Sequence, residues 1–165
     1  MQEIFTRFSV RKFEDKPVEP DKIEQLMRAT MAAPTAGNQR GWTFYIVRNK
    51  EVLEKLSEAS KYARPAANAP QALVICWDVN KLRYDYMAQI DCALATENFW
   101  LELTHLGLGG VMLGIAPVEE RMEKVSAALN LPENIKPFTI VPFGYPAENR
   151  AQKDRYEPER IQYID

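Results

Sequence analysis

The sequence predicts an α/β or α+β sandwich, in which helices cover both sides of a β-sheet. Segments whose apolar residues recur at helical spacing alternate along the chain with short apolar runs, and no repeat or low-complexity linker interrupts them. Residues 72–77 are almost wholly apolar, which is typical of a strand buried on both faces. Because the chain has 165 residues and 46% of them are hydrophobic, we expect a single domain, 1–165.

The first half of the chain predicts two helices and a strand. Pro20 and Asp21 open a helix that Pro34 ends. Residues 43–47 form the first strand, and Asn49 is placed to cap the helix that follows it. The apolar faces of the two helices comprise Ile23, Leu26, Met27, Thr30 and Met31 in the first, and Val52, Leu53 and Leu56 in the second.

The second half continues the alternation after strand 72–77. The longest helix candidate is 87–106, and its apolar residues surround most of the helix, as in a helix at the centre of a protein. These residues are Ile90, Leu94, Phe99, Trp100, Leu101 and Leu103. An amphipathic helix from Val118 to Leu129 and a last core strand at 138–143 complete the domain. The charged tail 147–165 offers only a short apolar strand, 161–164, and alone would be a frayed end.

Charge and composition exclude several classes of partner. With 21 basic and 23 acidic residues the net charge is −2, so no global positive field exists to hold nucleic acid or an anionic membrane. No stretch approaches about 18 uncharged apolar residues, so no membrane span is expected and a cytoplasmic protein is the default. Cys76 and Cys92 have apolar neighbours and no close cysteine partner, which favours buried, reduced thiols.

A local anion site is predicted near the N-terminus. Arg7, Ser9 and Arg11 alternate, and in an extended chain side chains two apart point the same way. Two guanidinium groups and a hydroxyl can therefore converge on one phosphate or carboxylate. Alternating basic residues also occur on solvated strands, so the pattern alone leaves that alternative open.

Three further motifs accompany these residues. Residues 33–38 read Ala-Pro-Thr-Ala-Gly-Asn and lead to Trp42, 106–109 read Leu-Gly-Leu-Gly, and 141–146 read Val-Pro-Phe-Gly-Tyr-Pro. In this order and at these spacings, over 5–155, the chain resembles the nitroreductase family of FMN-dependent oxidoreductases. The resemblance implies a three-layer sandwich with a central mixed or antiparallel sheet. It also implies an intertwined homodimer, in which the tail 147–165 reaches the partner subunit and each flavin lies at the interface.

The resemblance implies a position for each part of FMN. Arg7 and Ser9 match the family's phosphate-binding positions, and Lys153 and Arg155 match the basic pair that joins them. Arg11 lies where the family places a basic side chain beneath the N1 and O2 edge of the ring, where a positive charge favours reduced, anionic flavin. Without the resemblance, Lys153 and Arg155 would be interpreted as solvated. The implied cofactor-binding residues are Arg7, Phe8, Ser9, Arg11, Pro34, Thr35, Ala36, Asn38, Leu113, Gly114, Lys153 and Arg155.

Two of the implied binding segments act through the backbone or a partner. The segment 34–38 resembles the loop through which the second subunit closes over the flavin ring, although an ordinary helix-terminating loop is the alternative. Leu113 and Gly114 lie where the family points backbone N–H groups toward N5 and O4. The chain departs from the family at Arg40-Gly41, where Gln-Pro usually precedes Trp42. This change removes a stiff turn residue and adds a cation near the flavin, which favours acidic substrates.

Side-chain catalysis and metal binding receive no support from the sequence. His105 is the only histidine and has no Cys, Asp or Ser partner in view, so a structural role is expected. No three residues have the spacing of zinc ligands. Gly107, Gly109 and Gly110 lack the third glycine of a dinucleotide loop and are expected to act as C-cap residues after the long helix.

The expected function follows from the resemblance. NAD(P)H would reduce FMN, and a small acceptor such as a nitroaromatic or a quinone would then take the hydride in the same cleft, with no catalytic side chain required because flavin N5 carries it. A related flavin-dependent enone reductase or dehalogenase is the second enzymatic reading. The non-enzymatic alternatives are a dimeric protein that holds FMN without turnover and an α/β scaffold whose basic residues are merely solvated.

Overall fold

One antiparallel sheet organises the chain, and the computed structural model describes it over residues 2–164, so Met1 and Asp165 lie outside the described residues. The strand order is β1-β2-β5-β3, and β4 also pairs with β5. All four strand pairings are antiparallel, with Trp42 opposite Trp77 in the first and Gln71 opposite Phe143 in the second. The strands are β1 (Trp42–Val47), β2 (Gln71–Asp78), β3 (Gly109–Gly110), β4 (Leu113–Gly114) and β5 (Ile135–Gly144).

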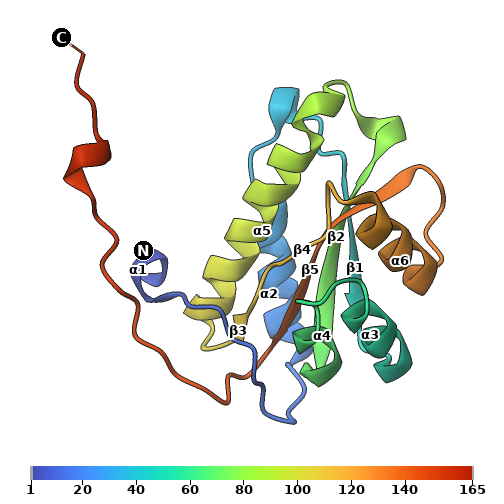
Figure 1. Ribbon diagram of the computed structural model, residues 1–165, viewed down its shortest axis with the longest axis horizontal. Coiled ribbons are helices and arrows are strands. Elements are labelled where there is room, and N and C mark those ends of the chain that lie inside the picture. The colour runs from blue at the N-terminus through green and yellow to red at the C-terminus, as the bar shows by residue number, and fades with distance from the viewer. Residues whose placement is uncertain (1, 165) are drawn as a thin grey trace.

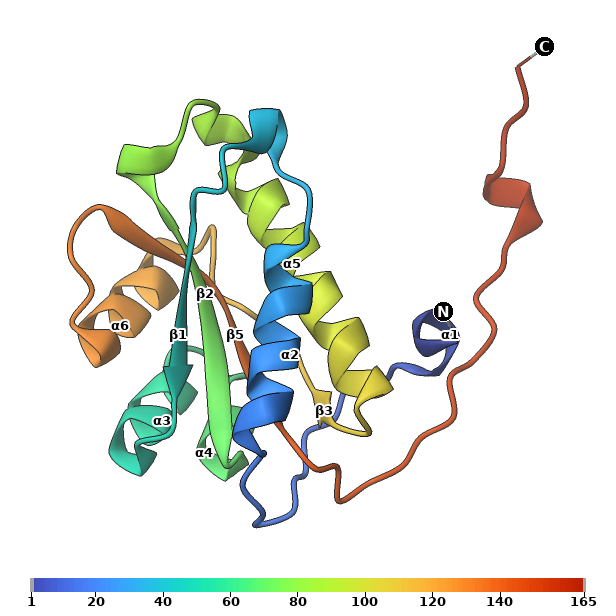
Figure 2. The same ribbon diagram turned by 180° about the vertical axis from the view of Figure 1, so that it is seen from behind.

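Helices cover both faces of this sheet, so the predicted three-layer sandwich is confirmed (Figures 1 and 2). One face carries α2 (Pro20–Met31) and α5 (Ala88–His105), and the other carries α3 (Lys50–Ser57), α4 (Pro65–Asn68) and α6 (Glu119–Leu129). The short helix α1 (Glu3–Thr6) lies near the C-terminal end of α5. No helix within residues 2–164 is long and apolar enough to span a bilayer.

Strand β2 divides the core, as its apolar sequence predicts. Ala72, Val74 and Cys76 pack with the helices of one face, whereas Leu73 and Ile75 pack on the other side with α2 and α5. All five side chains are fully buried. Because successive side chains on a strand point to opposite faces, a run without polar residues is needed when both faces are covered.

Local sequence signals place several of the helix ends. Pro20 occupies the first turn of α2, and the Asn49 side chain accepts a hydrogen bond from the Val52 N–H at 3.1 Å, as expected of a cap. Gly107 ends α5 with a φ of 70°, a left-handed conformation that glycine adopts without strain. Gly109 and Gly110 were expected to share this capping role, but they form β3, where Gly110 pairs with Phe143.

The long helix α5 is buried on its sheet-facing side, but within a single chain its outer face is exposed. Ile90 is 50% exposed and Leu94 40%, so burial all round this helix requires a second chain, and that expectation stays a prediction. Met31, expected on the buried face of α2, is likewise 52% exposed. The expected strand 161–164 pairs with no strand of the same chain within residues 2–164. After a single helical turn at Pro158–Arg160, this part of the tail is extended and remote from the body (Figure 1).

Candidate functional site

The segment 7–11, here called the N-terminal arm, and the C-terminal tail 147–165 meet around a cavity of about 340 Å³. The Gln152 side chain, 145 positions further along the chain, donates a hydrogen bond to the Arg7 carbonyl and ties the tail to the arm. The structure thus brings together two groups of residues that the sequence keeps far apart. Six predicted binding residues line the cavity: Arg7, Phe8, Ser9, Arg11, Lys153 and Arg155.

Gly110 fixes the position of the arm against the sheet. Its carbonyl accepts hydrogen bonds from the Val10 N–H at 3.0 Å and from Trp100 Nε1 at 3.1 Å, and Ser9 forms an isolated parallel bridge with it. A Cβ at Gly110 would lie 2.9 Å from the Pro142 carbonyl oxygen. Only glycine therefore lets the arm, the helix and the sheet approach this closely.

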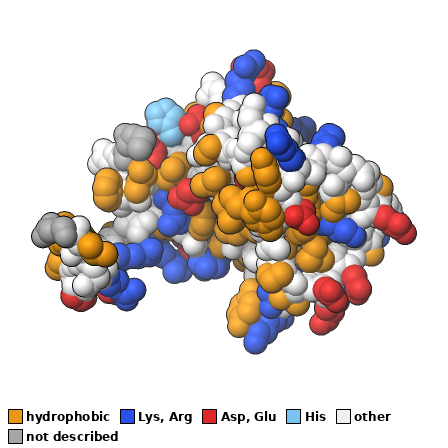
Figure 3. All heavy atoms as spheres, turned by 90° about the horizontal axis from the view of Figure 1, so that it is seen from above, with side chains coloured by type: hydrophobic (Ala, Val, Ile, Leu, Met, Phe, Trp, Pro, Cys, Tyr) orange, Lys and Arg blue, Asp and Glu red, His pale blue; other side chains and the backbone are white. Residues whose placement is uncertain are grey.

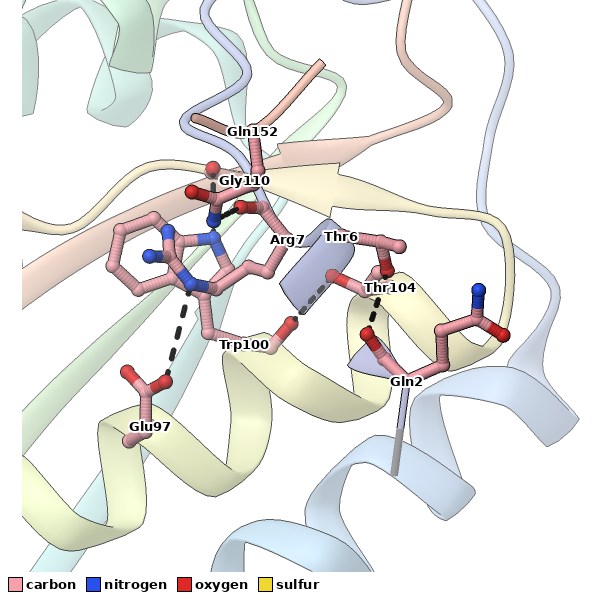
Figure 4. A network of polar contacts seen from close by, with 8 residues as sticks. All are labelled: Gln2, Thr6, Arg7, Glu97, Trp100, Thr104, Gly110 and Gln152. Carbon is pink, nitrogen blue, oxygen red and sulfur yellow. Dashed lines mark hydrogen bonds and ion pairs between the residues drawn. The ribbon is translucent and has the colours of Figure 1, made fainter. Parts of the chain in front are cut away.

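The Arg7 side chain lies over an aromatic platform. Its guanidinium carbon is 4.0 Å from the centre of the Trp100 ring, and its Nε is 3.9 Å from a Glu97 carboxylate oxygen (Figure 4). The side chain is only 16% exposed. Stacking on the indole orients the guanidinium while leaving its in-plane N–H groups available, because the cation–π contact uses the face of the group.

Arg11 is held by its backbone rather than by its charge. Its N–H donates to Glu148 Oε1 at 2.8 Å, and this bond, together with the Arg150 side chain 3.1 Å away, keeps the pKa of Glu148 below its usual value. The Arg11 side chain donates from Nη1 to the Ser9 carbonyl at 3.3 Å. Lys and Arg side chains gather between the extended tail and the body (Figure 3). The cavity wall contains five cations, Arg7, Arg11, Arg150, Lys153 and Arg155, which makes it suited to an anion with more than one charge.

The predicted loop 34–38 lies elsewhere in the same chain. The Ala36 N–H donates to Asp91 near the start of α5 at 3.0 Å, whereas Arg7 lies over Trp100. Nine residues of helix separate Asp91 from Trp100, which corresponds to about 13 Å along the axis. Within one chain, therefore, the structure does not bring Pro34, Thr35, Ala36 and Asn38 to the cavity.

Leu113 and Gly114, also predicted to bind the cofactor, do not line this cavity and lie further along the sheet. They form β4, opposite Ile140 and Thr139 of β5, four residues beyond the Gly110 contact with the arm. Leu113 is buried, whereas Gly114 is exposed and nothing lies within 4 Å of a Cβ built on it. Arg121 of α6 donates to the Gly114 carbonyl at 3.0 Å. Open space therefore lies beside this strand at Gly114 but not at Leu113.

Known proteins match this chain over almost its whole length. The model of the nitroreductase family matches residues 4–76 and 61–145. This chain belongs to the nitroreductase family. A relative from Archaeoglobus fulgidus, provisionally named an NADH dehydrogenase/NAD(P)H nitroreductase, is 42% identical over 163 residues, covering 96% of this chain and 93% of the relative.

Two further members relate the family to this fold and to a named activity. The crystal structure of a protein from Clostridium acetobutylicum, provisionally named an NADH oxidase, is 41% identical with a TM-score of 0.95 and covers 99% of each chain. An FMN reductase [NAD(P)H] from Bacillus subtilis is 26% identical over 173 residues, covering 94% of this chain and 69% of that protein. The nitroreductase resemblance seen in the sequence is confirmed.

The thiols and the histidine of this nitroreductase-family chain lie away from the cavity. Burial raises the pKa of Cys92 to about 12 and that of Cys76 well above its usual value, so neither is a reactive thiolate. His105 Nδ1 lies 3.0 Å from Glu3 Oε1, and the pKa of His105 is raised chiefly by this hydrogen bond. Across residues 2–164 no group of three potential metal ligands comes together.

Sequence reasoning about this family member missed several residues that shape the site. Trp100 was predicted only as one of the apolar residues around the long helix. Its contact with Arg7 could not be predicted from neighbouring residues, because the two are far apart in sequence. Gln152 likewise acts only through the fold. Asp91 carries a signal that could have found it: it is a carboxylate among the small buried residues Ala88, Cys92 and Ala95 of α5. A buried charge at such a position requires hydrogen-bond partners.

Proposed function

We propose that this nitroreductase-family protein binds FMN in the cationic cavity and uses NAD(P)H to reduce a small organic acceptor, such as a nitroaromatic or a quinone. The observation that carries the proposal is the convergence of Arg7, Ser9, Arg11, Lys153 and Arg155 on one cavity wall. The chain is an NAD(P)H-dependent flavin oxidoreductase in this proposal, and the name of the Bacillus subtilis relative, which gives both FMN and NAD(P)H, supports it.

The cavity fits the phosphate end of FMN. A phosphate monoester carries close to two negative charges at neutral pH and three acceptor oxygens, which match a forked guanidinium, a second cation and a hydroxyl. Each charge-assisted hydrogen bond contributes about 1.5–3 kcal/mol before ordering costs. Two or three such bonds from Arg7, Lys153 and Arg155 therefore contribute about 3–9 kcal/mol before ordering costs.

The strip from Gly110 to Gly114 fits the remainder of the cofactor. The absence of a side chain at Gly114, which has open space above it, lets a flat ring approach the backbone there, whereas Gly110 serves to pack the arm against the sheet. When bound, FMN supplies hydride transfer at its N5 atom. The chain's own groups bind and orient it, and Arg11, fixed by Glu148 and Ser9, supplies a positive charge that raises the reduction potential.

A homodimer completes the site in this proposal. The loop 34–38 lies about 13 Å along α5 from the Arg7 contact, so a second chain is needed to place such a loop over the ring. Two features support pairing of chains: α5 exposes Ile90 and Leu94, and the tail leaves the body as an extended arm (Figure 2). We place the dimer in the cytoplasm.

The acceptor in this proposal is a small molecule. Because Arg40 carries a positive charge, we expect anionic acceptors to be preferred over neutral ones. Arg40 is exposed on the same loop, with its N–H bonded to Thr35 Oγ1 at 3.1 Å. A guanidinium at the mouth of the site favours acceptors with a carboxylate or sulfonate. Comparison of a sulfonated naphthoquinone with its neutral parent tests this directly. A kcat/KM no higher for the sulfonated compound contradicts the preference.

The spectrum of the purified protein and one turnover assay test the proposed function. We expect visible flavin absorbance, release of one FMN per chain on heating, and steady NAD(P)H consumption when a quinone is added, which Arg11→Glu abolishes. A bound flavin that NAD(P)H does not reduce identifies a binding protein instead. Turnover restricted to enones or halogenated aromatics identifies a related reductase or dehalogenase. A colourless protein that fails to take up added FMN contradicts the proposal.

A further inference from the structure

The loop after α2 adopts a backbone conformation that few side chains favour. Gly37, Asn38 and Arg40 all have φ between 46° and 54°, in the left-handed region. Glycine and asparagine tolerate this region, whereas arginine is uncommon there. Non-glycine residues persist in such conformations only when surrounding contacts determine them, and they concentrate at binding and catalytic sites.

A buried carboxylate holds this loop to α5. Asp91 is 3% exposed, and its two oxygens accept hydrogen bonds from opposite ends of the loop: Oδ1 from the Ala36 N–H at 3.0 Å and Oδ2 from Gln39 Nε2 at 2.6 Å. Asp91 lies in the first turn of α5, where the helix dipole favours a negative charge. A buried carboxylate kept in this way is costly to leave without partners, so its bonds strongly favour one loop conformation.

The Gln39 side chain extends the connection to a third segment. Its Oε1 accepts from the backbone N–H groups of Arg83 at 3.0 Å and Tyr84 at 2.9 Å, and its Nε2 also donates to the Tyr84 carbonyl at 3.2 Å. Two N–H donors on Oε1 fix the orientation of the amide, so only Nε2 can face Asp91. The ring of Tyr84 in turn lies 2.6 Å from where a Cβ of Gly37 would be.

None of these contacts uses the side chain of Asn38 or of Arg40, which face outward from the loop. Asn38 and Arg40 flank Gln39 in sequence and are exposed, whereas Gln39 is turned inward. Alternation of one inward anchor with two outward polar side chains is the arrangement expected of a presenting loop on a rigid support.

We propose that Asp91 and Gln39 are positioning residues, which lock the 35–40 loop so that Asn38 and Arg40 are presented to the flavin and acceptor bound by a partner subunit. The inference rests on the proposed function and deepens it, because it names the groups that determine the geometry of the acceptor side. The phosphate cavity, about 13 Å away along α5, is a separate part of the site.

The hydrogen bond between Asp91 and Gln39 can be tested by exchanging its donor and its acceptor. In Asp91→Asn, the amide nitrogen faces Gln39 Nε2, and in Gln39→Glu, two carboxylates face each other. In the double variant D91N/Q39E, the asparagine oxygen still accepts from the Ala36 N–H, its amide donates to the new carboxylate, and that carboxylate still accepts from Arg83 and Tyr84. The double variant therefore restores the Asp91–Gln39 hydrogen bond with reversed polarity and the same net charge, but it loses the Gln39 Nε2 bond to the Tyr84 carbonyl, which a carboxylate oxygen cannot make.

The variants are compared as FMN-loaded protein with a quinone acceptor. Each single variant is expected to lower kcat/KM by about 10- to 100-fold and to alter the visible circular dichroism of the flavin, because a displacement of about 1 Å has costs of this size. The Kd for FMN should change by less than about threefold, since charge-assisted bonds to the phosphate dominate it. The double variant should have a higher kcat/KM than either single variant and a flavin spectrum closer to the original, and it stays below the wild type because the bond to the Tyr84 carbonyl is lost.

A matched control separates positioning from general stability. Asp78 is also buried and also accepts from a backbone N–H, that of Asn80 at 3.0 Å, and from a side-chain amide, that of Asn134 at 2.7 Å. Both donors reach the same Asp78 oxygen, Oδ1, so an asparagine could still accept from them; the control is therefore Asp78→Ala, which leaves both donors without this partner. Asp78→Ala should lower the melting temperature but leave kcat/KM unchanged. If a single Asp91 or Gln39 variant does not fold, Thr35→Val tests the same loop from its surface, because it removes only the bond to the Arg40 N–H.

Three outcomes overturn the inference: single variants with kcat/KM within about twofold of the wild type, a folded double variant that stays as impaired as the singles, or Thr35→Val with unchanged kinetics and flavin spectrum. All three require a wild-type protein that turns over. A wild type that binds no FMN or oxidises no NAD(P)H refutes the proposed function instead, so the two failures are distinguishable.

Discussion

Neutralising Arg7 tests whether the cationic cavity holds a phosphate. Arg7→Gln keeps a polar side chain of similar reach but removes the charge from a group that is 16% exposed and stacked 4.0 Å above Trp100. The nearest carboxylate, Glu97, is 3.9 Å from Nε and itself 53% exposed, so it competes weakly for the guanidinium donors.

The expected effect follows from one lost charge-assisted hydrogen bond. A loss of about 1.5–3 kcal/mol corresponds to an increase of about 10- to 150-fold in the Kd for FMN. The lost cation–π contact lowers the free energy of unfolding by only about 0.5–1 kcal/mol, so the protein should remain folded. The wild-type Kd should also rise with salt, because the attraction is electrostatic.

Titration of flavin-free protein with FMN, followed by the quenching of flavin fluorescence, measures the Kd. The matched control is Arg28→Gln, which removes an arginine that is 77% exposed and paired with Glu24 one helical turn away on α2. This surface pair contributes about 0.3–0.5 kcal/mol to stability and should not influence FMN binding. A Kd for Arg7→Gln that matches the control would remove Arg7 from the phosphate site and refute the placement of the cofactor in this cavity.

Three further predictions address the support of the site. Gly110→Ala should lower the free energy of unfolding by about 1–3 kcal/mol in urea titrations, because its Cβ meets backbone, whereas Gly114→Ala should leave it within about 0.5 kcal/mol while weakening FMN binding; equal stabilities would refute the packing argument. The pairing of His105 with Glu3 contributes fully between the unfolded glutamate pKa near 4.5 and the unfolded histidine pKa near 6.5. It is lost as pH rises through the raised folded pKa of His105, and as pH falls toward the Glu3 pKa of about 2. Glu3→Gln should therefore lower the His105 pKa in an NMR titration of this single histidine, and an unchanged pKa contradicts the pairing. Deletion of 147–165 should weaken FMN binding and self-association together, and sedimentation showing an unchanged dimer with full FMN would contradict the proposed role of the tail.

Sequence reasoning succeeded where the determining interactions are local. The cap at Asn49 and the two-faced burial of β2 depend on residues close together in the chain, so pattern and propensity suffice. The exposure of Ile90 and Leu94 could not be predicted, because apolar residues around a helix do not say which of its faces the same chain covers.

The loop connection marks the other limit of prediction. Asp91 and Gln39 are 52 positions apart, and the sequence around either residue gives no indication that the two are hydrogen-bonded. The cavity itself was predictable only through the family, because the charged tail around Lys153 has the composition of a solvated run. Contacts between distant segments, rather than local preference, therefore determine both parts of the site.

The pairing of β5 also constrains how the chain reaches its native state. This strand is the shared partner of β2 on one side and of β3 and β4 on the other, yet it follows all of them in the sequence. On the ribosome, β3 and β4 have no strand to pair with until residues 135–144 have left the exit tunnel, and the Gly110 support for the N-terminal arm is incomplete until then. The β1–β2 pair can form early, but the three pairings with β5 must be late events of synthesis that depend on long-range contacts. Until they form, the nascent chain exposes the apolar edge of β2, and such an edge is a template for pairing with other chains.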